Sequence, residues 1–311
     1  MKSGWNGRTL IWMVLLQIGI FSFGCDNPGT QTRIKKSVAH LPEKEKIKEV
    51  KVNGDKGEHE DADEQDDNKY VKPVPQPPQD MVEDLPDSNT RYIYLTFDDG
   101  PQTGTMNCYR ICKELGVKAS FFMVGQHADR HLRYIVDTIR DSYPEMVLVN
   151  HSYSHAHNHY KKFYAAPAAA QFDFYRAQDS LRIPYKILRL PGNSTWSVRE
   201  RLTGPHNTLR TARLLDSAGY DLIGWDVEWN FKGKESAPVQ SAEQMVKMID
   251  AYADSKHLKT RNHIVILTHD RMFAPTAASD SLYKFIGELR KNRRYVFRTI
   301  DQYPGIKRNK T

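Results

Sequence analysis

Residues 91–101 read RYIYLTFDDGP, an apolar stretch that runs into two adjacent aspartates and a Gly-Pro pair. The apolar part is rich in aromatic and β-branched side chains, which favours a buried strand. Taken alone, Asp-Asp-Gly is typical of a turn, in which aspartate accepts backbone hydrogen bonds and glycine takes a positive φ. Adjacent residues of a regular strand point to opposite faces, so Asp98 and Asp99 can share one pocket only if the chain bends. We expect Gly100-Pro101 to provide that bend.

Six more apolar runs of this kind follow along the chain, separated by segments that can form helices. The runs are residues 119–124, 146–151, 186–191, 220–225, 263–269 and 295–300, and the helical segments are 103–115, 127–142, 167–182, 208–217, 241–254 and 278–291. Alternation of this kind favours a mainly parallel sheet. We therefore predict an α/β fold, with a closed or nearly closed β/α barrel as the leading architecture and an open doubly wound sheet as the alternative. No Gly-rich phosphate-binding fingerprint follows the first strand, which argues against a nucleotide-binding sheet.

The first 88 residues have a different character from the rest of the chain. Residues 1–25 have two basic residues, then an apolar run that is too short for a membrane-spanning helix, then Gly-Cys, which is the pattern of a secretory signal. A small residue directly before Cys25 resembles a bacterial lipobox and predicts an exported, membrane-tethered lipoprotein of the cell envelope. Simple secretion and an uncleaved anchor are the alternatives. Residues 26–88 are polar, acidic and proline-rich, which predicts a disordered linker to a domain at 89–311.

Charge and cysteine content narrow the class of protein. The chain has 311 residues, of which 39% are hydrophobic, and this is enough for a substantial core. Its net charge of +7 is uneven, because residues 41–88 carry −8 and residues 89–311 carry +11. A basic domain can attract nucleic acid, anionic lipid or an acidic polymer, and export argues against nucleic acid. No obligate protein partner is implied. Cys108 and Cys112, one helical turn apart, are too distant for a disulfide and are expected to be reduced core residues.

Polar side chains stand at the ends of five of the predicted strands. In a β/α barrel the reactive groups gather at the C-terminal ends of the strands. The set comprises Asp98 and Asp99, His151 with His155, Arg189, Asp226 with Glu228, and His269. Each has an ordinary interpretation alone, such as a turn, a solvated loop or a core histidine. Their joint position at successive strand ends favours a single site.

A metal centre is the chemistry that this set favours. Two histidines four apart can aim at one point if the backbone turns helically between them, and one carboxylate completes three ligands. Nitrogen and oxygen donors suit Zn²⁺, with Co²⁺ or another transition metal as alternatives. Three protein ligands leave positions for water and substrate, which is a hydrolytic arrangement. A neighbouring carboxylate that is not a ligand can then accept a proton from water.

The motifs TFDDGP, HSYSH, RLPG, WDVEW and ILTH, in this order and at these intervals, resemble the five motifs of the polysaccharide deacetylases, carbohydrate esterase family four. The resemblance covers about residues 91–299 and implies a distorted seven-stranded (β/α) barrel. It implies metal-dependent hydrolysis of N-acetyl groups on an N-acetylglucosamine-containing polysaccharide of the cell envelope or the extracellular space, with an acetylated glycan polymer as the substrate. The alternatives are an O-acetyl esterase of the xylan type and a catalytically silent glycan-binding lipoprotein.

The resemblance also implies roles for the residues at the centre of the site. Asp98 would be the catalytic base and His269 the general acid that protonates the departing amine. The metal ligands would be Asp99, His151 and His155.

Other residues would support this centre or bind the substrate. Arg189 would hold and tune the base. Asp226 would orient His269, although WDVEW is shorter than the family's usual spacing and leaves Glu228 as the alternative. The substrate-binding candidates begin with Gly192, whose peptide N–H could stabilise an oxyanion, and Leu267, which would line the acetyl pocket. Trp196 and Trp229 are candidates for stacking on sugar rings, with core packing as the alternative for Trp229.

Overall fold

The computed structural model describes residues 89–128, 131–198 and 201–307. The predicted signal segment, the lipidation site at Cys25 and the linker at residues 26–88 lie outside this described part. Among the helices of the described part, none combines the length and the apolar character needed to cross a bilayer.

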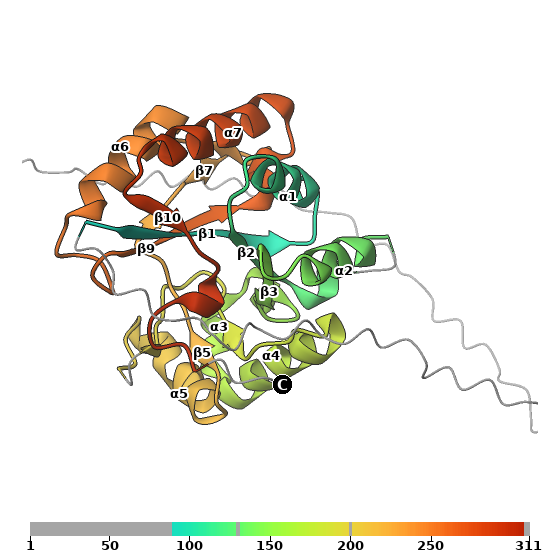
Figure 1. Cartoon of the computed structure of the whole chain (residues 1–311). Helices are drawn as coiled ribbons and strands as arrows, with labels where there is room; N and C mark the ends of the chain where they lie inside the picture. The colour runs from blue at the N-terminus through green and yellow to red at the C-terminus, as the bar shows by residue number, and fades with distance from the viewer. Residues whose placement is uncertain (1–88, 129–130, 199–200, 308–311) are drawn as a thin grey trace, which may run out of the picture. The chain divides into compact units, whose positions relative to one another are not determined.

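A curled parallel sheet forms the centre of the domain, in the order β5-β4-β3-β2-β1-β9-β6 (Figure 1). Its strands are β1 (Arg91–Gly100), β2 (Ala119–Met123), β3 (Met146–Asn150), β4 (Ile187–Leu188), β5 (Asp221–Leu222), β6 (Val227–Glu228) and β9 (His263–His269), and β10 (Tyr295–Phe297) pairs with the first residues of β1. All seven predicted strands are present, and the short β6 is an addition. The predicted α/β fold is confirmed.

The chain between β5 and β6 joins the two ends of this sheet. The backbone N–H of Ile223 donates to the carbonyl of Leu188, the last residue of β4, over 3.0 Å. Three residues later, the N–H of Asp226 donates to the carbonyl of Val265 in β9 over 2.9 Å. The segment thus crosses from one edge of the sheet to the other without forming a regular strand pair. This crossing makes the architecture a distorted (β/α) barrel and not an open doubly wound sheet.

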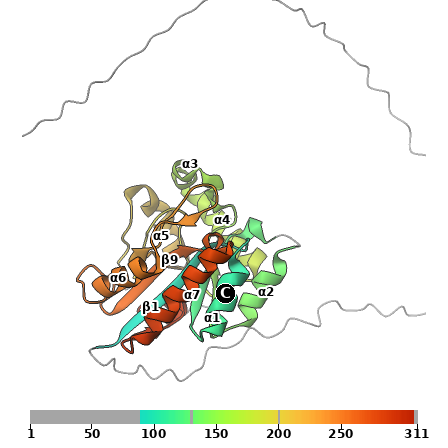
Figure 2. The same cartoon turned by 90° about the horizontal axis from the view of Figure 1, so that it is seen from above.

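Helices cover the outside of the barrel. They are α1 (Thr105–Glu114), α2 (Arg133–Asp141), α3 (Tyr160–Ala165), α4 (Pro167–Leu181), α5 (Leu209–Ser217), α6 (Ala242–Ala253) and α7 (Thr276–Lys291). Helices α6, α7, α1 and α2 lie side by side in Figure 2, and α4 and α5 pack together on another part of the barrel. The short α3 and a two-stranded hairpin, β7 (Phe231–Lys232) with β8 (Ala237–Pro238), were not predicted from the sequence.

Strand β1 shows how the alternation of side chains builds two cores. Ile93, Leu95 and Phe97 pack outward against the covering helices, in the same cluster as the buried free thiols of Cys108 and Cys112. Tyr92 and Tyr94 belong to the interior cluster of the barrel. The next positions on the interior face are Thr96 and Asp98, so the pattern that fills the barrel also delivers one carboxylate to its C-terminal end.

Candidate active site

The two aspartates at the end of β1 face one pocket because the strand is irregular at this point. Asp99 has φ 75°, and the pairing with β2 shifts register between Asp98 and Gly100. Both side chains are buried and line the same cavity. The predicted bend is therefore present, but it lies in Asp99 itself. Gly100 contributes by lacking a side chain, since a Cβ there would come within 2.6 Å of Oδ2 of Asp270.

The loop after β3 brings His151 and His155 to the same cavity. Ser152 has φ 69°, and its N–H donates to Oδ1 of Asn150 over 2.8 Å. The Ser152 hydroxyl in turn accepts from the N–H of His155 over 3.0 Å, and Asp173 of α4 accepts from the two N–H groups between them. His155 begins a short helix, η2 (His155–Asn158), with φ 50°. The turn between the histidines is thus left-handed in part, where we expected an ordinary helical turn.

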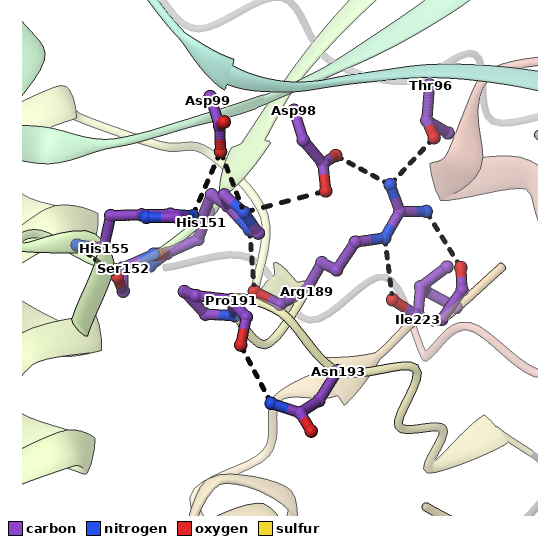
Figure 3. A network of polar contacts seen from close by, with 12 residues as sticks. Thr96, Asp98, Asp99, His151, Ser152, His155, Arg189, Pro191, Asn193 and Ile223 are labelled. Carbon is purple, nitrogen blue, oxygen red and sulfur yellow. Dashed lines mark hydrogen bonds and ion pairs between the residues drawn. The ribbon is translucent and has the colours of Figure 1, made fainter. Parts of the chain in front are cut away.

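The hydrogen bonds of the two histidines direct their Nε2 atoms at Asp99 (Figure 3). Nδ1 of His151 lies 3.0 Å from the carbonyl oxygen of Arg189, and Nδ1 of His155 lies 3.2 Å from Oδ1 of Asn158. Because an oxygen of either kind can only accept, each Nδ1 carries a proton, which leaves Nε2 as the ring atom that can bind a cation. These Nε2 atoms lie 3.6 Å and 3.1 Å from Oδ1 of Asp99.

This cluster fits a divalent cation. Asp99, His151 and His155 offer three ligand atoms that all lie within 4.8 Å of one another. Oδ1 of Asp99 is buried and accepts no hydrogen bond from any described residue. Burial alone would raise the pKa of Asp99, but the two histidines outweigh it and hold that pKa well below its usual value. Three potential ligand atoms, one of them a carboxylate oxygen, thus lie close enough together for one cation to bind all of them.

The second carboxylate, Asp98, has a different partner. Arg189 is fully buried, and its Nη1 donates to Oδ1 of Asp98 over 2.7 Å and to the hydroxyl of Thr96 over 2.8 Å (Figure 3). Its other nitrogens donate to the carbonyls of Ile223 and Gly224. The guanidinium thereby fixes one oxygen of Asp98, while Oδ2 faces the metal-binding cluster, 3.6 Å from Nε2 of His151. Asp98 is thus available as a proton acceptor.

The neighbouring wall of the cavity is formed by the end of β9. His269 is paired in register with Asp98, and Leu267 with Thr96, so both wall residues stand beside the end of β1. Burial lowers the pKa of His269, against the opposing effect of Asp99 and Asp98. His269 and Leu267, together with Gly192 from the loop after β4, line a cavity of about 470 Å³, a size within the usual range for ligand pockets.

The predicted support of His269 by Asp226 is not present. Oδ1 of Asp226 accepts from the backbone N–H of Lys259 and Oδ2 from that of Val265, both over 2.8 Å. Asp226 therefore holds the crossing segment onto β9. Glu228 does line the cavity, but the indole of Trp225 is its hydrogen-bond partner, and burial raises its pKa. Among the described residues, Nδ1 of His269 has no hydrogen-bond partner.

Neither tryptophan that was a candidate for sugar stacking lines the cavity. Trp229 is completely buried among Phe273 and Phe285, as core packing requires. Trp196 packs inside the barrel against Tyr303.

The aromatic rings that line the cavity are Tyr160, Trp225 and Phe231. Trp225 ends a predicted strand and could have been found by the same rule as the other residues. Tyr160 and Phe231 lie on the short α3 and β7, which the sequence pattern did not reveal.

Asp270, directly after His269, is a buried acid that the site chemistry does not use. It is hydrogen-bonded to Gln102 over 2.7 Å and to the hydroxyl of Thr105, and it ties the start of α1 to the end of β9. Burial raises its pKa to about 8, although these hydrogen bonds oppose the shift. The folded protein therefore holds a proton that the unfolded chain releases near pH 4.

This raised pKa predicts that Asp270 makes the fold less stable as the pH rises. The folded state binds the extra proton between about pH 4 and the folded pKa of about 8, so its stabilising effect is complete below that window and is lost through it. The loss is up to about 1.4 kcal/mol per pH unit. We expect the unfolding free energy of the wild type to fall from pH 5 to pH 8 relative to that of Asp270→Asn, because the variant cannot lose this proton. Urea unfolding in EDTA measures both proteins. A difference that stays constant with pH would contradict this.

The fold and the site together fit a class, a hydrolase with a candidate metal site at the C-terminal end of a β/α barrel. Residues 86–194 match the family model described as polysaccharide deacetylase, and this range includes β1 and the loop that carries His151 and His155. The match agrees with the resemblance deduced from the motifs.

Particular relatives agree with this class. A chitin disaccharide deacetylase of Vibrio alginolyticus is 24% identical over 306 residues, covering 68% of this chain and 71% of the relative. The putative polysaccharide deacetylase YheN of Bacillus subtilis is 25% identical, and the alignment covers 57% of each chain. Among solved structures, a Streptococcus mutans CE4 esterase superposes with a TM-score of 0.52 at 22% identity, over 68% of this chain and 87% of that one. The structural likeness shows the fold alone.

Proposed function

We propose that this protein is a metal-dependent hydrolase that removes N-acetyl groups from an N-acetylglucosamine-containing polysaccharide of the cell envelope. The observation that carries the proposal is that the two adjacent carboxylates have different partners. Asp99 faces the Nε2 atoms of two histidines, whereas Asp98 is held by a buried arginine through one oxygen. A ligand and a base side by side are what metal-assisted hydrolysis of an amide requires.

The chain supplies the remaining parts of a hydrolytic mechanism. A divalent cation held by Asp99, His151 and His155 would polarise the acetyl carbonyl and make water a better nucleophile. Asp98 accepts the proton of the attacking water through Oδ2, while Arg189 keeps its carboxylate in place. His269, beside Asp98 on the neighbouring strand β9, would donate the proton that the departing amine needs. Leu267 offers an apolar wall for the acetyl methyl group.

The class of substrate is inferred from the relatives and from charge. One relative is named for deacetylation of chitin disaccharide and another as a putative polysaccharide deacetylase. A bifunctional xylanase/deacetylase of Pseudobutyrivibrio xylanivorans is 37% identical over 67 residues, which keeps O-acetyl xylan as a test substrate. The positive charge of the domain suits the anionic polymers of a cell envelope.

Acetate release from a panel of glycans tests the substrate class. We expect the metal-loaded full chain to release acetate from N-acetylated chitin-type or peptidoglycan-type oligomers, and to act much less on O-acetylated xylan. Mass spectrometry of the products identifies each lost acetyl group. Release from O-acetyl substrates alone would reassign the protein as an esterase, and binding without any release would assign a glycan-binding role.

We further propose that Cys25 carries a lipid anchor and that residues 26–88 tether the domain to the membrane. The support is the sequence pattern of the signal segment and the acidic, proline-rich composition that follows it. Membrane fractions from a bacterial host should release the full chain with detergent and retain it in high salt. Complete release by salt alone would contradict the anchor.

A further inference from the structure

The helix α3 (Tyr160–Ala165) links the metal-binding loop to the loop after β4. It starts directly after η2, the helix that begins with His155. The hydroxyl of Tyr164 donates to the carbonyl of Pro191 over 2.7 Å, which fixes the helix on that loop. Tyr160 is four residues earlier and so lies on the same face of the helix. This face therefore presents one tyrosine to Pro191 and the other to Gly192.

The ring of Tyr160 lies directly on Gly192. A Cβ built on Gly192 would stand 3.1 Å from Cζ of the ring and 3.2 Å from both Cε atoms, so the end of the ring that carries the hydroxyl covers this residue. The φ of Gly192 is 68°, a second reason for glycine at this position. On its other side, the ring stands at 83° to the ring of His155, with centroids 5.9 Å apart. Tyr160 thus fills the wall of the cavity between a metal ligand and Gly192.

The hydroxyl of Tyr160 is free to bind a substrate. Tyr160 lines the cavity together with Asp98, Asp99 and His269. No described residue forms a hydrogen bond with its hydroxyl, whereas the hydroxyl of Tyr164 is committed to Pro191. A tyrosine hydroxyl is protonated at neutral pH and can donate. A donor therefore stands in the cavity wall beside the peptide N–H that could stabilise an oxyanion.

We propose that Tyr160 is a further catalytic residue of this site and that its hydroxyl donates a hydrogen bond to the acetyl oxygen of the substrate. The assignment rests on the proposed deacetylase function. Negative charge grows on that oxygen when water attacks the carbonyl carbon, so the hydrogen bond is stronger in the transition state than in the bound substrate. The glycine at position 192 leaves the room that the ring needs to reach this place.

Replacement of Tyr160 by phenylalanine tests the hydroxyl alone, because the ring and its packing on Gly192 and His155 are retained. We expect kcat/KM for N-acetylated oligomers to fall about 10- to 100-fold, the range for a hydrogen bond to a charged group, mainly through kcat. Zn²⁺ affinity should stay at the wild-type value. The matched control is Tyr109→Phe. Tyr109 lies on α1 and does not line the cavity, and its hydroxyl is hydrogen-bonded to Ser142, so the change should leave kcat/KM unchanged.

Binding of acetate to the Zn²⁺-loaded protein gives a second readout that needs no turnover. Its carboxylate has an oxygen to accept the same hydrogen bond, so calorimetry should show several-fold weaker binding to Tyr160→Phe than to wild type or Tyr109→Phe. Equal acetate affinity in all three proteins, or no acetate binding to the wild type, would overturn the assignment. If the wild type binds acetate but deacetylates no glycan, the proposed function fails and the acetate comparison still decides the role of Tyr160.

Discussion

Asp98→Asn is expected to lower kcat/KM for acetate release by about 10²–10⁴-fold, the contribution of a general base, while the protein still binds one metal ion. The amide retains the shape of the side chain and can accept the hydrogen bond from Arg189, but it cannot take a proton from water. Asp99, His151 and His155 are untouched, so the metal affinity should remain close to that of the wild type. The measurement pairs steady-state kinetics with a calorimetric Zn²⁺ titration.

The substitution also removes a buried negative charge, and this needs its own control. Arg189 is fully buried and would lose its counter-ion, so the free energy of unfolding should fall. Retained Zn²⁺ binding would show that the site is still folded in the variant. Asp137→Asn, which changes a partly buried ion pair with Arg140 on α2, should leave both kinetics and metal binding unchanged. Near-normal turnover by Asp98→Asn would remove Asp98 from the role of base.

His155→Ala is expected to weaken Zn²⁺ binding by at least about 100-fold and to abolish turnover with it. Loss of a residue that merely orients a ligand already costs 10–100-fold in metal affinity, and His155 supplies one of three ligand atoms. Its Nε2 lies closer to Asp99 than that of His151 does, at 3.1 Å against 3.6 Å. A competition titration against a Zn²⁺ chelator measures the affinity.

A neighbouring histidine provides the matched control for this variant. His159 is exposed, and its Nδ1 is bonded to the carbonyl of His157, so His159→Ala removes an imidazole from the same loop without touching the cluster. It should keep wild-type Zn²⁺ affinity. An equal loss of Zn²⁺ affinity in both variants would mean that the loop is merely disturbed. Wild-type Zn²⁺ affinity in both variants would mean that His155 is not a ligand.

The central cluster could be predicted from the sequence because each member stands at the end of a long, strongly apolar strand. Strands β1, β3 and β9 have clear patterns, and parallel strands bring their C-terminal ends to one rim. Asp98, Asp99 and His269 follow from this rule, and the spacing of His151 and His155 adds the loop. The contact between Arg189 and Asp98 also agrees with its position after β4.

The contacts of the residues around the central cluster could not be predicted, since they depend on short elements and on backbone partners. Asp226 stands at a strand end like the others, but its oxygens are taken by two backbone N–H groups that no sequence pattern reveals. Trp229 packs against Phe273 and Phe285, and only the folded structure shows that its ring is in the core. Tyr160 and Phe231 lie on elements of six and two residues, too short for any periodicity to show.

The most direct test of the metal-dependent mechanism is acetate release from N-acetylated glycan oligomers by one sample of the protein, taken through removal and return of the metal. The account predicts that release stops when a chelator strips the cation from Asp99, His151 and His155, and that it returns when one equivalent of Zn²⁺ or Co²⁺ is added back. Acetate release that continues at its full rate in the metal-free protein would contradict it.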